Sequence, residues 1–124
     1  MKIYEIASFI SRVQKKLAKK KLKFKVNIYA PRCNRSTPTD LYSLELRFDI
    51  LIPLNETWNT VLSGYIDIYF TSPRLIKISI NDTVYKSNLL STQRLVDVLV
   101  DGLVYIVENN INIINEDDTV STGQ

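Results

Sequence analysis

Apolar residues recur every three or four positions near the start of the chain. Between residues 3 and 20 they are Ile3, Ile6, Ala7, Ile10, Val13 and Leu17. This spacing predicts an amphipathic helix, because an α-helix completes a turn about every 3.6 residues. A second helix is expected from Ser91, a suitable N-cap residue, to about Glu108. Most of its circumference is apolar, so we expect it to be the more deeply buried helix.

Between these helices the apolar pattern changes to a period of two, which indicates β-strands. The alternation predicts strands at residues 22–30, 44–52, 65–70, 76–80 and 83–87. Pro31 and Pro53 are expected to end the first two strands, because proline lacks the N–H that a sheet ladder uses, and residues 31–40 have the composition of a loop. Asn81-Asp82 predicts a hairpin turn.

These elements predict an α+β fold with the order α-β-β-β-β-(β)-α. We expect a four- to five-stranded antiparallel sheet with two helices packed on one face. The length of 124 residues suits one domain, which we place at residues 1–115, followed by a polar acidic C-terminal tail at residues 116–124.

Composition bears on where the protein acts. No apolar stretch is long enough to span a membrane, and Cys33 is the only cysteine, so no internal disulfide can form. We therefore expect a cytoplasmic protein without a membrane partner. Ile, Asn, Lys and Tyr, which are encoded by A/T-rich codons, are abundant. This bias is typical of AT-rich bacteria, their phages and some viruses. A viral or mobile-element accessory protein in the host cytoplasm fits this bias.

The sequence lacks the residues of most catalytic centres. There is no histidine, no phosphate-binding glycine loop, no dinucleotide-binding glycine motif and no second cysteine for a thiolate metal site. Carboxylate chemistry with Mg²⁺ is what remains, with Glu45, Asp49 and Asp67 on one predicted sheet face. Cross-strand pairing of these residues with Arg47 and Lys77 is the competing interpretation. We expect no enzyme activity, no cofactor and no metal.

Charge is unevenly distributed along the chain. Residues 1–35 hold 11 basic residues against Glu5 alone, whereas residues 36–124 hold 5 basic and 12 acidic residues. The candidate anion-binding residues follow from this cluster: Arg12, Lys15, Lys16, Lys19, Lys23, Lys25, Arg32 and Arg35. They are expected to face an anionic partner such as nucleic acid, or else serve only as a solvated surface. Capping of the lysines by Glu116, Asp117 and Asp118 would contradict the first interpretation.

Two further surfaces are candidate interfaces. The sheet face away from the helices is expected to carry Tyr29, Arg47, Tyr65, Tyr69, Lys77 and Tyr85. Such a face suits cross-strand pairing, a protein interface or the stacking of nucleic-acid bases. The second helix offers Val96, Val100, Val104 and Val107, which either pack internally or form a contact with a partner. Trp58 is expected to cap the core, with a partner-facing position as the alternative.

The sequence thus favours a small non-enzymatic binding module that engages an anionic macromolecule, either nucleic acid or nucleoprotein, through a basic first helix and strand. The alternative is a protein-interaction or inhibitor protein, such as a phage or plasmid accessory factor. It would act through the open sheet face or as a homodimer.

Overall fold

Two helices and five antiparallel strands make up the part of the chain that the structure describes. The computed structural model describes residues 1–71, 73–89 and 91–122, and their side chains except those of residues 92 and 112–122. The helices are α1 (Ile6–Lys19) and α2 (Leu95–Thr122), each preceded by a short 3-10 turn, Ile3–Glu5 and Thr92–Arg94. The strands are β1 (Lys25–Arg35), β2 (Leu41–Leu54), β3 (Thr57–Tyr69), β4 (Leu75–Ile80) and β5 (Thr83–Asn88).

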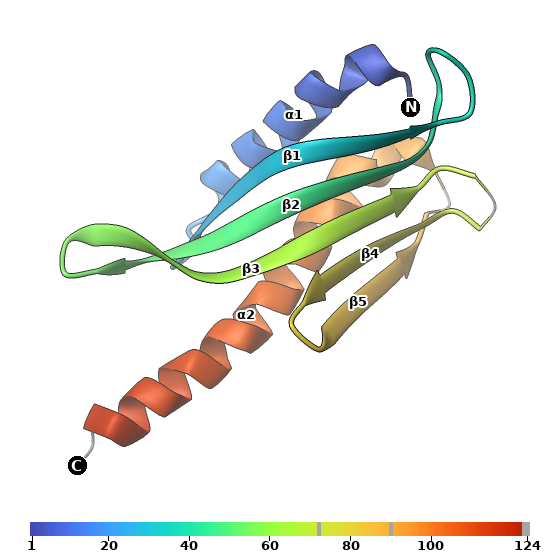
Figure 1. The fold of residues 1–124 in the computed structure, drawn as a ribbon. Coiled ribbons are helices and arrows are strands. Elements are labelled where there is room, and N and C mark those ends of the chain that lie inside the picture. The colour runs from blue at the N-terminus through green and yellow to red at the C-terminus, as the bar shows by residue number, and fades with distance from the viewer. Residues whose placement is uncertain (72, 90, 123–124) are drawn as a thin grey trace.

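Each strand pairs antiparallel with the next, giving a sheet in the order β1-β2-β3-β4-β5. Figure 1 shows both helices behind this sheet, with α1 toward β1 and α2 running behind the remaining strands. The structure therefore confirms the α+β fold in the predicted order and includes the fifth strand. Among the described residues, no helix has both the length and the apolar character needed to cross a membrane.

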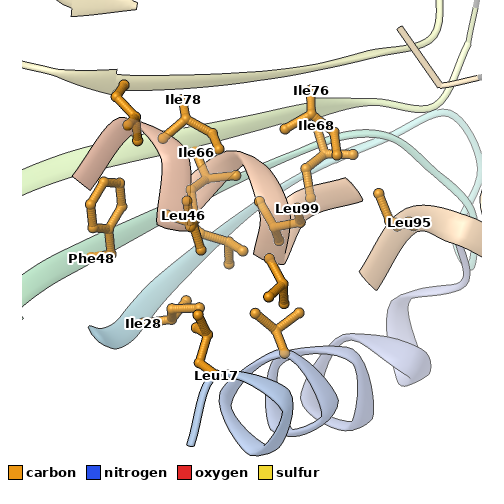
Figure 2. Packing of buried hydrophobic residues seen from close by; sticks show 14 of the residues in the cluster. Leu17, Ile28, Leu46, Phe48, Ile66, Ile68, Ile76, Ile78, Leu95 and Leu99 are labelled. Carbon is orange, nitrogen blue, oxygen red and sulfur yellow. The ribbon is translucent and has the colours of Figure 1, made fainter. Parts of the chain in front are cut away.

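One face of the sheet carries the core. Every second side chain of the central strands points to this face and is excluded from solvent: Leu44, Leu46, Phe48, Ile50, Ile66, Ile68, Ile76, Ile78 and Ile80. Figure 2 shows this layer meeting Leu17 of α1 and Leu95 and Leu99 of α2. Burying one such side chain fully contributes roughly 1.5–3 kcal/mol. The apolar layer therefore determines which face of the sheet the helices cover.

Helix α1 buries a narrow stripe and leaves the rest of its surface in water. Its buried residues are Ile6, Phe9, Val13 and Leu17. The helix ends at Lys19, because Lys20 has an extended backbone with ψ at 143°. Lys16 and Lys19 lie in its last turn, where positive charge interacts favourably with the free carbonyl groups of the helix end.

The valine residues of α2, a candidate interface in the sequence, pack against the chain's own core. Val100 and Val107 are 0% exposed, so of the two predicted alternatives they pack internally and do not face a partner. The reason is that α2 packs against β4, β5 and α1, which surround this side of the helix. Val96 and Val104 are partly buried and pack against the same core.

Tyr85 also lies on the helix face of the sheet, which corrects its predicted place on the open face. The short turn between β4 and β5 sets a register in which Tyr85 pairs with Ile78, and cross-strand partners share a face. Gly102 of α2 leaves room for the ring, since a Cβ at that position would lie 2.5 Å from it. The ring also contacts Tyr105, with 5.8 Å between the ring centroids.

Strand β1 continues past Pro31, its predicted end. Ala30 has a left-handed backbone (φ 52°), and the pairing with β2 shifts at this point, which marks a β-bulge. A residue without an N–H is tolerated here because β1 is an edge strand of the sheet. The strand begins at Lys25 and ends at Arg35, so the predicted loop shrinks to residues 36–40.

Strands β2 and β3 extend beyond the rest of the sheet as a two-stranded ribbon, here called the hairpin tip (residues 52–59). It projects at the left of Figure 1. β2 passes through Pro53, its predicted end, and turns at Asn55 and Glu56, whose φ values of 52° and 67° suit a tight hairpin turn. β1 pairs with β2 only as far as Leu51, so the hairpin tip has a free edge on which proline is tolerated.

Helix α2 is longer than the pattern predicted. It continues beyond Glu108 to Thr122, so residues 116–122 of the predicted acidic tail are helical. Figure 1 shows this part of α2 running past the sheet toward the C-terminus. The division into a domain at 1–115 and a tail stays a prediction.

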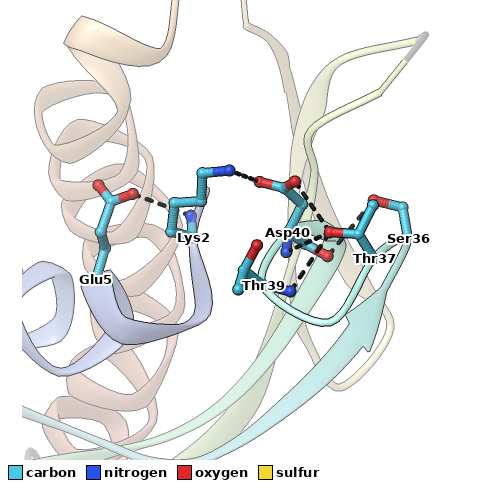
Figure 3. A network of polar contacts seen from close by, with 6 residues as sticks. All are labelled: Lys2, Glu5, Ser36, Thr37, Thr39 and Asp40. Atoms are coloured by element: carbon cyan, nitrogen blue, oxygen red, sulfur yellow. Dashed lines mark hydrogen bonds and ion pairs between the residues drawn. The ribbon is translucent and has the colours of Figure 1, made fainter.

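The N-terminus is fixed to the loop between β1 and β2, as Figure 3 shows. Lys2 forms a backbone bridge and an ion pair with Asp40. The hydroxyl of Thr37 donates a hydrogen bond to the same carboxylate at 3.0 Å. The Leu41 N–H donates to the Met1 carbonyl at 2.9 Å, so the first residues are fixed next to the sheet.

This anchor predicts a pH-dependent contribution to stability. The hydrogen bonds from Lys2 and then Thr37 lower the pKa of Asp40 below its usual value. A lowered carboxyl pKa stabilises the fold above the unfolded-state pKa of about 3.9, and this contribution is lost as the pH falls through the lower folded-state value. Urea unfolding should therefore find wild type more stable than Asp40→Asn at neutral pH and equally stable near pH 2. A difference in the free energy of unfolding between wild type and Asp40→Asn that does not change with pH would contradict the role given to the Asp40 carboxylate.

A close contact in the core predicts a strong effect at Gly64. A Cβ at this position would lie 2.3 Å from the Ser79 carbonyl oxygen and 2.6 Å from the Phe48 ring. Gly64→Ala should therefore force backbone or ring shifts and destabilise the protein by about 1–3 kcal/mol, measured by urea unfolding. Thr60→Ala, at an exposed position of the same strand, is the control and should change stability by less than about 0.5 kcal/mol.

Candidate polyanion-binding surface

Exposed basic side chains gather where α1 ends and β1 begins. We call this surface the basic end, and its members are Lys15, Lys19, Lys20, Lys21, Lys23 and Lys25. All are exposed, and residues 6–39 contain no aspartate or glutamate. The lysines are brought together because α1 must turn its apolar stripe to the sheet and its opposite side to water.

The predicted anion-binding residues separate into different environments. Lys15 and Lys19 are exposed on α1, as expected, whereas Arg12 is exposed near the middle of the helix and lines a separate hollow with Glu5, Gln93 and Val96. Lys16 lies on the flank of α1 that faces α2 and forms an ion pair with Asp97, so its charge is partly neutralised. Within the side chains that the structure describes, the other ion pair is that of Lys2.

Lys23 and Lys25 extend the basic end from α1 to β1. Lys23 lies in the connection before the strand, and Lys25 is the first residue of β1. The ammonium group of Lys25 lies 4.0 Å from the ring centroid of Trp58 in the hairpin tip. A cation over an indole at this distance is attracted by the ring's electrons. This contact joins the lysines to an aromatic group that the sequence had suggested as a core cap.

Arg32 and Arg35 are distant from the lysines at the start of β1. They lie near the far end of β1. Since a strand rises about 3.3 Å per residue, Arg35 is roughly 30 Å from Lys25. Arg32 also lies opposite Glu45 of β2. The predicted anion-binding set therefore does not form one surface.

Sequence reasoning missed Lys20, Lys21 and the position of Trp58. The two lysines belong to the same basic stretch, but Lys20 is the last residue of the predicted helix range and Lys21 lies between that helix and the predicted strand, where periodicity assigns no face. Trp58 is 44% exposed in the hairpin tip and therefore does not cap the core. Its position follows from the extension of β2 and β3, which Pro53 had concealed.

A hollow of about 430 Å³ opens between the end of α1, the start of β1 and the hairpin tip. Its lining residues are Gln14, Leu17, Ala18, Lys20, Leu22, Phe24, Lys25, Val26 and Trp58. Most of the lining is apolar, Lys20 and Lys25 are among the lining residues, and the ammonium group of Lys25 lies over the Trp58 ring. The site thus combines apolar walls, an aromatic ring and positive charge.

The open face of the sheet is occupied by contacts among its own side chains. The Tyr29 hydroxyl donates a hydrogen bond to Asp49 at 3.1 Å, which raises the pKa of Tyr29, and the Ser63 hydroxyl donates to the same carboxylate at 2.7 Å. The Arg47 guanidinium lies 5.4 Å from the Tyr65 ring centroid. These contacts are those expected of a sheet that satisfies its own polar groups.

The remaining predicted residues of this face also have cross-strand neighbours. Lys77 lies opposite Asp67, and Tyr69 lies between Ser43 and Leu75. Tyr69 is 40% exposed. The open face therefore presents aromatic surface to solvent, with acidic and basic side chains interspersed.

The predicted magnesium carboxylates do not form a metal-binding cluster. Asp67 lies directly opposite Glu45, whereas Asp49 lies further along β2 and accepts hydrogen bonds from Tyr29 and Ser63. Among the residues that the structure describes, no group of three or more His, Cys, Asp or Glu side chains is arranged to hold a metal ion. Glu116, Asp117 and Asp118 have side chains outside the described part of the structure.

Comparisons of the chain with protein-family models, curated proteins and solved structures found no match. Functional inference therefore depends on the chain's own geometry.

The pair of Asp67 and Glu45 predicts a stabilising substitution. Partial burial, and then the charge of Glu45, raise the pKa of Asp67 above its usual value. Ionised Asp67 therefore destabilises the fold above its folded-state pKa and has no such effect below the unfolded-state pKa of about 3.9. Urea unfolding should find Asp67→Asn more stable than wild type at pH 7, with the difference disappearing near pH 3. A less stable variant at pH 7 would show that the pairing of Asp67 with Lys77 dominates.

Proposed function

We propose that this chain is a small non-enzymatic binding module that engages nucleic acid through the basic end. One observation carries the proposal: six basic side chains are exposed between residues 15 and 25, and residues 6–39 contain no carboxylate side chain. A phosphate backbone is the anionic partner whose charge density matches such a surface, because each contact releases a bound counterion.

The energetics of the free protein support this proposal. Lys15 and Lys19 are one helical turn apart, and like charges at this spacing destabilise a helix by roughly 0.2–0.5 kcal/mol. Asp97 forms an ion pair with Lys16. The remaining positive charges repel one another in the free protein, and an anionic ligand would remove this repulsion.

The distribution of charge favours the basic end over the open sheet face. On the open face, Asp49, Glu45 and Asp67 lie among the basic residues and would repel phosphate. Tyr29 and Arg47 are already engaged with neighbouring strands. The basic end has no such acidic neighbours in its own segment of the chain.

Salt dependence tests the proposal. Labelled DNA and RNA oligonucleotides should bind wild type at about 50 mM salt, and the affinity should fall by two to three orders of magnitude at about 200 mM if roughly six phosphates are contacted. Fluorescence anisotropy measures both affinities. Absence of binding to either nucleic acid at low salt would end the proposal.

A matched set of variants locates the surface. Lys15→Gln, Lys19→Gln and Lys23→Gln combined should weaken binding and reduce the magnitude of the slope of log affinity against log salt by about 2 to 3. The control removes the same charge elsewhere through Arg35→Gln, Arg74→Gln and Lys86→Gln, all at exposed positions. Equal weakening by both triple variants would show that binding depends on net charge and not on the basic end.

A further inference from the structure

The geometry points to single-stranded nucleic acid as the ligand, with an unpaired base stacked on Trp58 in the hollow and the lysines holding the neighbouring phosphates. This inference rests on the proposed function, because it specifies which form of nucleic acid the basic end binds. It assigns the stacking of a base to the hairpin tip, a role that the charge of the basic end does not by itself require.

Trp58 is unusually exposed for a tryptophan. Tryptophan is highly buried on average, yet this one is 44% exposed on a ribbon outside the main sheet. Its ring contacts the ammonium group of Lys25 at 4.0 Å, which joins the hairpin tip to β1. A partly exposed indole beside cations is the arrangement that single-strand binding sites use to stack bases.

The lining of the hollow matches the two chemical parts of a nucleotide. Leu17, Leu22 and Phe24 contribute apolar wall, against which the face of a base can lie. Lys20 and Lys25 lie among the lining residues and carry the charges that a phosphate requires. The volume of about 430 Å³ falls within the roughly 300–1,000 Å³ typical of small-ligand pockets.

A duplex does not suit this site as well as a single strand. Bases in a duplex are stacked on their neighbours and paired, so their faces are not accessible to a side chain. An acidic peptide without aromatic residues would pair with the lysines but would bring no aromatic face to Trp58. The combination of stacking surface and cations therefore favours unpaired nucleotides over duplex and over peptide.

Trp58 is the only tryptophan of the chain, so its fluorescence reports directly on the hollow. Oligo(dT) and oligo(U) should quench this fluorescence in a saturable manner at low salt. Inorganic polyphosphate should bind without comparable quenching, because it brings charge but no base. A duplex of equal length should bind more weakly than the single strands. Equal affinity for duplex and single strand, without quenching by oligo(dT) or oligo(U), would overturn the inference.

Substitutions separate stacking from charge. Trp58→Ala should weaken oligo(dT) binding roughly 5- to 100-fold, the effect expected for one stacked base, and leave polyphosphate binding unchanged. Trp58→Phe should retain most of the affinity. Tyr4→Ala removes another exposed aromatic residue (75% exposed) outside the basic end, and it is the control that should not change affinity.

The outcomes distinguish the two proposals. If Trp58→Ala binds oligo(dT) as tightly as wild type, while binding still depends on salt and on the lysines, stacking is wrong and the proposed function stands. If wild type binds no nucleic acid at low salt, both are wrong. Circular dichroism and urea unfolding confirm that Trp58→Ala is folded, which is expected because the side chain lies outside the core cluster.

Discussion

The burial of apolar side chains on a single face of the sheet is the constraint on which the rest of the structure depends. Leu46, Phe48 and their neighbours form one continuous layer, and both helices pack on it. α2 is apolar around most of its circumference and packs over this layer, β4 and β5 included. α1 contributes only a stripe, so the rest of its surface must face water. Its lysines are exposed because they lie outside the apolar stripe that packs on the core.

This constraint also explains how charge is arranged over the molecule. On the open sheet face acidic and basic residues are interspersed: Asp49 accepts a hydrogen bond from Tyr29, Arg47 lies over the Tyr65 ring, and Lys77 lies opposite Asp67. The basic end has no acidic residues in its own stretch of the chain, because α1 and the start of β1 come from a segment without them. The hairpin tip then brings Trp58 to the same end of the molecule. The exposed lysines and the Trp58 ring therefore lie on one surface.

Periodicity was sufficient to predict the elements and their order, but not their lengths or neighbours. Pro31 and Pro53 were read as strand ends, whereas a bulge and a free edge allow both strands to continue. The place of Tyr85 could have been derived, because a short turn at Asn81-Asp82 fixes its pairing with Ile78. The contact of Lys25 with Trp58 joins distant parts of the chain, so no local pattern could indicate it. The same holds for the separation of Arg35 from the lysines.

Lysine reactivity tests the central claim most directly, because it reports whether the basic end is open to solvent. Brief acetylation of the free protein, read by mass spectrometry, should modify Lys15, Lys19, Lys20, Lys21 and Lys23 rapidly and the ion-paired Lys2 and Lys16 slowly. Slow modification throughout the basic end would mean that other parts of this chain, such as the acidic residues near its C-terminus, already cover these lysines. That result would contradict the account.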